Sequence, residues 1–184
     1  MSLARGFFRH GSNGLLFATL AGFAVIFAWQ PRAFSALAFS IGFFVFLVTE
    51  YTTHRFTLHA PPHRSSFVRS LQHRLHYDHH LTPERLDLLF LPPWFAEPAA
   101  LAFFGVYFTL TRSATLALAL LFGSLLALLY YEWVHYVAHV PFQPITLAGR
   151  WMKKYHLLHH FKNEPFRGPR DAPKSGTTRH SFDR

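Results

Sequence analysis

Apolar positions gather into four long stretches, and the charged positions lie mostly between them. Residues 11–30, 33–49 and 113–131 carry no charged side chain, and residues 94–111 carry only Glu97. Each stretch is close to the roughly 20 residues with which a helix crosses the hydrocarbon core of a bilayer. The first and second stretches are joined by a very short link, and so are the third and fourth. Links this short can join only antiparallel neighbouring helices. The pattern therefore predicts an all-α integral membrane protein with four transmembrane helices in two hairpins.

The first stretch has a second interpretation. Arg5 and Arg9 precede it, as basic residues precede the apolar part of a signal peptide, but no convincing small-residue cleavage site follows. A retained span is therefore the preferred interpretation. Four crossings place both chain ends on one side of the membrane, together with every Lys and Arg except Arg32 and Arg112. The positive-inside rule predicts that this side is cytoplasmic, in the inner membrane of a bacterium or the endoplasmic reticulum of a eukaryote.

Composition agrees with a membrane protein. Hydrophobic residues make up 51% of the 184 residues and charged residues 15%, and cysteine is absent. The lack of cysteine excludes disulfides, thiolate zinc sites and Cys-ligated iron–sulfur clusters. A net charge of +9 suits anionic lipid headgroups in such a chain, so we expect a membrane and no nucleic acid as partner. Proline, glycine and charges dominate after Lys162, which predicts one membrane domain over residues 1–162 and a disordered tail over 163–184.

Histidine provides the chemical signal. Ten of the 14 histidines fall into two copies of one layout, in which the second member of a pair is followed 17 residues later by a His-x-x-His-His cluster. The first copy comprises His54, His59, His76, His79 and His80, and the second His135, His139, His156, His159 and His160. Neutral imidazole is the commonest metal ligand, and ten exceed what one ion can coordinate. A site for two metals is the simplest interpretation.

The spacing indicates how these side chains are presented. His135 and His139, and the members of each cluster, are three or four residues apart and share one helical face. His54 and His59 are five apart, so they serve different metals or the helix loosens between them. All ten follow or end a predicted span. The metals are therefore expected directly above the bilayer, within reach of a lipid tail.

Two glutamates precede the histidines by one helical turn. Glu50 lies four residues before His54, and Glu132 lies three before His135. Each could ligate a metal or accept the second ring N–H of a ligand and fix its tautomer; the alternative is an interfacial acid paired with an arginine. Asp78 is a weaker candidate of the same kind. We expect the remaining histidines not to be ligands: His10, His63, His73 and His180.

Several other metal and redox chemistries lack their motifs. The sequence contains no His-Glu-x-x-His zinc protease helix. A ferritin-like bundle needs two Glu-x-x-His motifs, of which only that of Glu132 is present. No Gly-x-Gly-x-x-Gly loop for a nicotinamide or flavin occurs either, so reducing equivalents are expected from another protein.

The histidine segments resemble the fatty acid hydroxylase / sterol desaturase superfamily of membrane non-haem di-iron enzymes. The similar segments are HRFTLH at 54–59, HYDHH at 76–80, HYVAH at 135–139 and YHLLHHFKN at 155–163, with prolines at 83, 92 and 93. The resemblance covers roughly residues 34–163, and four clusters in this order make it specific. The sequence departs from the family after residue 164, where an aromatic–Gly–Val–Thr stretch and a Trp-Asp pair would follow.

The resemblance implies four spans under a cytoplasmic helical cap that holds two iron ions. It implies the ten histidines as ligands, eight or nine of them directly, and O2-dependent hydroxylation of a fatty acyl, sterol-like or related lipid in lipid biosynthesis. Electrons would come from an external cytochrome b5-like or ferredoxin-like protein. Iron follows from the resemblance alone, because imidazole also suits zinc, which purified protein could carry. The alternatives are a lipid desaturase, a carotenoid ring hydroxylase, or a catalytically inactive metal-binding membrane protein.

Overall fold

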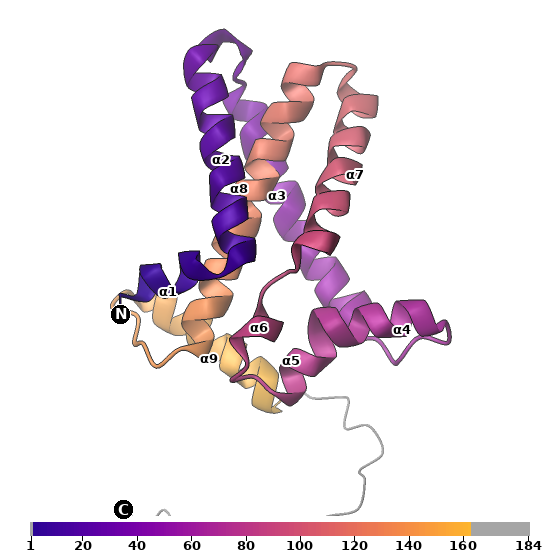
Figure 1. Ribbon diagram of the computed structural model, residues 1–184, viewed down its shortest axis with the longest axis vertical. Helices are drawn as coiled ribbons and strands as arrows, with labels where there is room; N and C mark the ends of the chain where they lie inside the picture. The colour runs from indigo at the N-terminus through magenta and orange to yellow at the C-terminus, as the bar shows by residue number, and fades with distance from the viewer. Residues whose placement is uncertain (1, 163–184) are drawn as a thin grey trace, which may run out of the picture.

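The computed structural model describes residues 2–162, with side chains described as far as His160. Within that range four helices are long and apolar enough to cross a membrane. They are α2 (Gly11–Trp29), α3 (Ala36–Thr53) with the π-helical turn η2 (His54–Leu58), α7 (Pro93–Thr111) and α8 (Ala114–His139). Figure 1 shows them as a bundle with both hairpin turns at one end and the shorter helices at the other. The predicted membrane bundle of two hairpins is confirmed.

Local sequence explains both hairpin turns. Pro31 opens the short 3-10 turn η1 (Pro31–Ala33), and the Ser35 hydroxyl accepts a hydrogen bond from the Ala38 N–H (3.2 Å) to begin α3. Arg112 ends α7 in the left-handed conformation (φ 53°), and Ser113 then caps α8. A proline at a helix start and a hydroxyl cap are ordinary helix signals. A positive φ is uncommon for a residue other than glycine, such as Arg112.

Helix α8 forms the centre of the bundle. It packs against α2, α3, α7 and α9 (Leu147–Lys162). Of its most apolar 18-residue window 44% is buried, against 11–17% for the other three spans. The outer spans therefore direct most of their apolar side chains away from the protein. Such extensive exposed apolar surface is stable only in lipid.

Helices α3 and α8 cross in direct backbone contact. A Cβ atom added to Gly42 would lie 1.9 Å from the Leu120 carbonyl oxygen, and one added to Gly123 would lie 1.9 Å from that of Phe39. Small residues permit this approach between membrane helices. Ser124 then donates a hydrogen bond to the Gly42 carbonyl (2.9 Å). The crossing fixes the relative position of the two spans that carry histidines.

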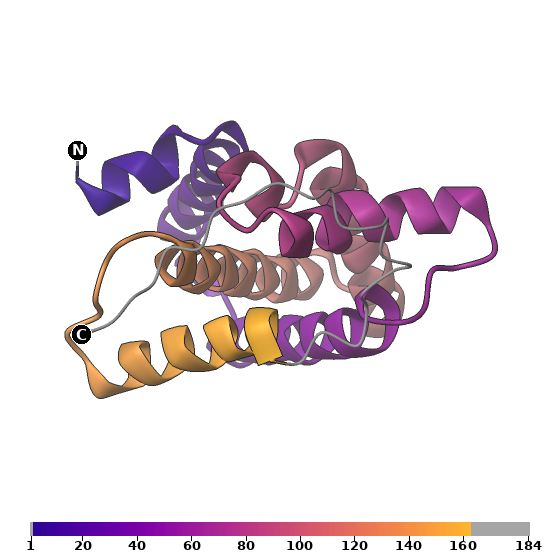
Figure 2. The same cartoon turned by 90° about the horizontal axis from the view of Figure 1, so that it is seen from below.

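The remaining helices form a cap at the histidine end of the bundle. They are α1 (Leu3–Arg9), α4 (Ser66–Gln72) with the π-helical turn η3 (His73–Tyr77), α5 (Asp78–Leu81), α6 (Leu86–Leu89) and α9. Figure 2, viewed from below, shows α9 running across the end of the bundle. Phe7, Leu89, Phe90 and Tyr136 form an apolar cluster that joins α1 and the α6 segment to α8. The predicted tail over 163–184 lies outside the described residues, so the domain boundary at 162 stays a prediction.

Candidate metal centre

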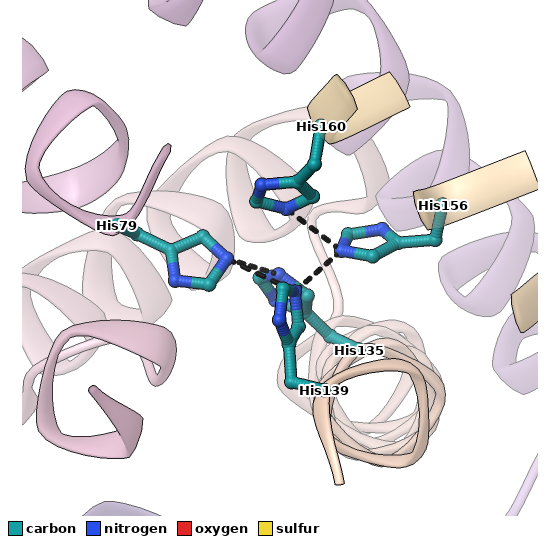
Figure 3. A group of neighbouring side chains, drawn as sticks. All are labelled: His79, His135, His139, His156 and His160. Atoms are coloured by element: carbon teal, nitrogen blue, oxygen red, sulfur yellow. Dashed lines mark hydrogen bonds between the residues drawn. The ribbon is translucent and has the colours of Figure 1, made fainter. Parts of the chain in front are cut away.

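Nine of the ten predicted histidines bring ring nitrogens together in two groups within the described part of the chain. In each group, one potential ligand atom per residue lies within 4.8 Å of all the others. The five-histidine group is His79, His135, His139, His156 and His160, and the four-histidine group is His54, His59, His76 and His159. Figure 3 shows the rings of the five-histidine group converging from α5, α8 and α9.

The two groups do not follow the two copies in the sequence. His79 belongs to the first copy but joins the group built mainly from α8 and α9. His159 belongs to the second copy but joins the group formed around η2 and η3. Each sequence copy thus gives one histidine to the other group. Helix α9 supplies histidines to both.

A π-helical turn brings His54 and His59 onto one face. The His59 N–H donates to the His54 carbonyl (3.1 Å), a hydrogen bond across five residues. Both Nε2 atoms then lie beside the Nε2 of His159, at 3.1 and 2.9 Å. Of the two predicted alternatives, loosening of the helix is the one found. Single π-helical turns are frequent at functional sites.

The separations between ring nitrogens match the ligand spacing around a metal ion. Neighbouring Nε2 atoms are 2.8–3.2 Å apart in the five-histidine group and 2.7–3.1 Å apart in the four-histidine group. Two nitrogens bound at about 2.1 Å and 90° apart would be separated by about 3.0 Å. Hydrogen bonds alone explain the spacing poorly. His59 Nε2 faces the Nε2 atoms of both His159 (2.9 Å) and His76 (2.7 Å). A neutral ring nitrogen carries either one proton or one lone pair, so it can form only one of these two hydrogen bonds.

Burial keeps these rings in the neutral form that binds metals. Loss of water contact, followed by repulsion from neighbouring imidazoles, lowers the pKa of His59 to about 4 and that of His79 to about 3. Burial likewise lowers the pKa of His159 to about 4. At neutral pH each of the three rings therefore offers a lone pair. Metal binding requires this protonation state. The donor set, its spacing and its charge all fit a pair of metal ions.

Glu50 lies where a carboxylate can orient a ligand. Its Oε1 is 3.2 Å from His54 Nδ1, so the proton is held on Nδ1 and Nε2 is left for a metal. The Tyr131 side chain lies near Glu50, and both residues line the same cavity. Sequence reasoning missed Tyr131, although it lies one turn before His135.

Glu132 has different surroundings. It is buried in α8, and its Oε1 accepts a hydrogen bond from the Leu91 N–H (2.9 Å). The contact holds the chain between α6 and α7 against α8. Its predicted role in orienting a histidine stays a prediction. Asp78, the weaker candidate, lies 3.1 Å from His73 Nδ1 at the surface.

His80 lies beside both groups. Its ring stacks on that of His160 with centroids 4.0 Å apart, and it is 5.1 Å from the ring of His59. Its Nε2 is buried without a hydrogen-bond partner among the described residues. Of the expected non-ligands, His63 accepts a hydrogen bond from the Ser65 N–H and His10 packs on Phe90. His180 lies outside the described residues.

A cavity opens onto the histidines. It has a volume of about 590 Å³. Its lining comprises Glu50, Tyr51, His54, Arg55, His59, Tyr131, His156 and His159. Since His156 belongs to one group and His54 to the other, the cavity reaches both. Several carbon atoms of an acyl chain fit in a space of this size.

Lys153 fastens α9 to the end of α8. Its Nζ donates to the carbonyl oxygens of Val137 (3.0 Å), Val140 (2.7 Å) and Phe142 (2.9 Å), which uses all three of its protons. One turn further along α9, His156 Nε2 faces His139 Nε2 at 2.8 Å. The lysine therefore positions two helices that share a histidine group. Sequence reasoning did not identify it.

Comparisons with known proteins agree with this geometry. A family model described as fatty acid hydroxylase matches residues 39–169. The rat fatty acid 2-hydroxylase (Rattus norvegicus) is 33% identical over 127 residues, which are 67% of this chain and 33% of the relative. The dihydroceramide fatty acyl 2-hydroxylase FAH1 of Arabidopsis thaliana is 32% identical over 66% of this chain and 50% of its own length. The chain thus spans about a third of the rat relative.

A solved structure is similar as well. It is described as full-length scs7p with only the hydroxylase domain visible. It superimposes with a TM-score of 0.65 at 29% identity, covering 82% of this chain and 56% of that one.

Proposed function

The chain belongs to the fatty acid hydroxylase family, and on this premise we propose that it is a membrane-bound, O2-dependent lipid hydroxylase. The proposed reaction converts a C–H bond of a fatty acyl chain to an alcohol. The names of the rat and Arabidopsis relatives support C2 as the position and a free or ceramide-linked acyl chain as the substrate. The observation that carries the proposal is the pair of histidine groups at one end of a membrane bundle, joined by a cavity.

We propose two iron ions as the metals, one in each histidine group. Bound there, they would supply the activation of O2 and the oxidation of an unactivated C–H bond. We keep all ten predicted histidines as ligands, with His80 as a ligand completed by a small shift of its ring. Overall the reaction consumes O2, two electrons and two protons, and yields the alcohol and water.

The protein's own residues prepare the site. Glu50 holds the proton of His54 on Nδ1, so that its Nε2 faces the group centre. Tyr131 lies beside Glu50 and lines the cavity with it. Burial of four of the rings, those of His76, His79, His135 and His160, keeps water away from them and would protect an oxidising site from side reactions. The cavity lies at the end of α3, beside the level at which an acyl chain would leave the bilayer.

We propose that electrons come from a separate cytochrome b5-like or ferredoxin-like protein. The sequence has no Gly-x-Gly-x-x-Gly loop for a nicotinamide or flavin. The excess of Lys and Arg at the histidine end supports a cytoplasmic location of the cap. An acidic donor would be attracted to that side.

Metal analysis and turnover of purified protein test the proposal. We expect two irons per chain and an O2-dependent 2-hydroxy acyl product when a reducing system is added. Lipid profiles of a deletion strain and its complemented counterpart should differ in the same product. A 2,3-unsaturated product would indicate a desaturase instead. Stoichiometric zinc, with no O2 consumed with any donor, would contradict the enzyme.

Three alanine variants test the ligands. His79→Ala and His159→Ala should each abolish turnover and lower the metal content, because each removes a nitrogen from a different group. His63→Ala should change neither, because His63 lies outside both groups and contacts the Ser65 backbone. Equal tolerance of all three substitutions would show that the groups do not bind the metals.

A further inference from the structure

Helix α9 has two faces of opposite character. The inner face carries the three histidines His156, His159 and His160, with Lys153 beside them. The outer face exposes apolar and aromatic side chains, with exposed fractions of 80% for Leu147, 60% for Trp151 and 52% for Tyr155. The positions fall at intervals of four residues, so they form one continuous stripe. The Trp151 and Tyr155 rings also contact each other, with centroids 4.4 Å apart.

This arrangement is the reverse of an ordinary surface helix. A helix on a water-soluble protein buries its apolar face and exposes its polar face. In α9 the polar face packs against the two histidine groups, and the apolar face is exposed. Large exposed aromatic side chains in a continuous stripe indicate a surface that is covered in use.

The position of α9 indicates what covers the stripe. Helix α9 runs across the end of the bundle, beside the point where α8 finishes (Figures 1 and 2). Tyr130 of the α8 span donates a hydrogen bond to the Met152 sulfur (3.7 Å). His159 meets His54 at the end of the α3 span. The helix therefore lies at the level where the spans leave the hydrocarbon.

Charge narrows the choice of partner. Arg150 and Lys154 are exposed on the same outer face, between the apolar side chains. No acidic residue occurs anywhere in α9. Tryptophan and tyrosine flanked by Arg and Lys are typical of helices lying in the membrane interface. Two cations near an anionic leaflet strengthen such binding.

We propose that the outer face of α9 is inserted into the anionic phospholipid headgroup layer of the membrane that the spans cross. Leu147, Trp151 and Tyr155 enter the boundary between headgroups and acyl chains. Arg150 and Lys154 bind the lipid phosphates. Because α9 supplies histidines to both groups, this contact also holds the ligands in place. The lipid surface is thus part of the support of the metal centre.

Spin-label accessibility tests this placement without depending on hydroxylase activity. The chain has no cysteine, so each introduced cysteine is the sole labelling site. Trp151→Cys and Tyr155→Cys are labelled and reconstituted in nanodiscs of phosphatidylcholine, with or without phosphatidylglycerol. Glu84→Cys is the matched control, since Glu84 is exposed on the link between α5 and α6. Leu147→Cys serves as a further position if Trp151→Cys fails to fold.

The result expected is protection of the α9 labels from a water-soluble nickel complex, with preferential exposure to O2, at a depth of about 5–10 Å. The label at 84 should stay accessible to the nickel complex. Protection should be greater with phosphatidylglycerol, and the double substitution Arg150→Gln/Lys154→Gln should remove that difference. Labels at 151 and 155 as accessible as the label at 84 would overturn the proposal. Protection that appears only when a soluble electron-transfer protein is added would overturn it too.

Discussion

Replacing Gly42 by alanine tests the close crossing of α3 and α8, on which the relative position of the two histidine groups depends. The added Cβ would lie 1.9 Å from the Leu120 carbonyl oxygen, whereas real Cβ contacts are essentially never under 3.0 Å. The helices must therefore part by about 1.1 Å at this point. Metal–ligand distances tolerate only about 0.2 Å. The obstructing atom is backbone and cannot rotate away.

Overpacking of this kind costs about 1–3 kcal/mol, and a backbone obstruction belongs at the upper end, about 3 kcal/mol. For a chain of this length the unfolding temperature should fall by about 6–12 °C. We also expect metal loss, because α3 continues directly into η2, which carries His54, and α8 carries His135 and His139. Thermal unfolding in detergent and metal content per chain measure the two effects.

Gly22→Ala provides the matched control. Gly22 lies in the α2 span, and a Cβ there would meet nothing within 4 Å. Since alanine is the better helix former by up to about 1 kcal/mol, this variant should be as stable as the parent or more so. If Gly42→Ala has the same unfolding temperature and the same metal content as Gly22→Ala, the reasoning about the α3–α8 contact is refuted.

Three further predictions concern single side chains. Lys153→Met should destabilise the protein by about 1.5–3 kcal/mol and weaken metal binding by the five-histidine group. Lys154→Met should have neither effect in neutral detergent. Thermal unfolding measures the stability, and chelator competition measures the metal affinity. Glu50→Gln should weaken metal binding by the four-histidine group about 10–100-fold, measured by Co²⁺ titration, and equal affinity to a Glu97→Gln control would contradict the Glu50 contact. Arg112→Gly should raise stability by about 1 kcal/mol, because glycine adopts a φ of 53° without steric cost; an unchanged unfolding temperature would argue against that conformation.

The spans could be predicted from sequence because the bilayer imposes their length and polarity. Their ends were less predictable. Charges at Glu50 and Glu132 marked where the apolar stretches stop, but α3 continues to Thr53 and α8 to His139. Hydropathy reports the thickness of the hydrocarbon core, and a helix does not end there when it continues into packed protein. The cap helices are short, and their sequence has no comparable constraint.

The sequence pattern pointed to histidines that come together in space, nine of them in two groups, but it did not predict how they are divided between the groups. Histidine spacing shows which rings share a helical face, but which faces meet depends on how α5, α8 and α9 pack. The exchange of His79 and His159 between groups is a result of that packing. Lys153 and Tyr131 escaped detection for the same reason: their partners are a set of carbonyl oxygens and a glutamate on another helix.

The exchange of His79 and His159 has a consequence for how the protein is made. His54 and His159 are separated by 105 residues, and His79 and His139 by 60. A metal in either group closes a loop of that length, as a disulfide would; in a chain-entropy account a loop of about 100 residues corresponds to about 4.7 kcal/mol. The chain has no cysteine, so the proposed coordination bonds would take the place of disulfides as its long-range cross-links. Each group contains at least one histidine of α9, so neither group is complete during synthesis until α9 has left the ribosome. We therefore expect a chelator to destabilise this protein as a reductant destabilises a disulfide-bonded secreted one.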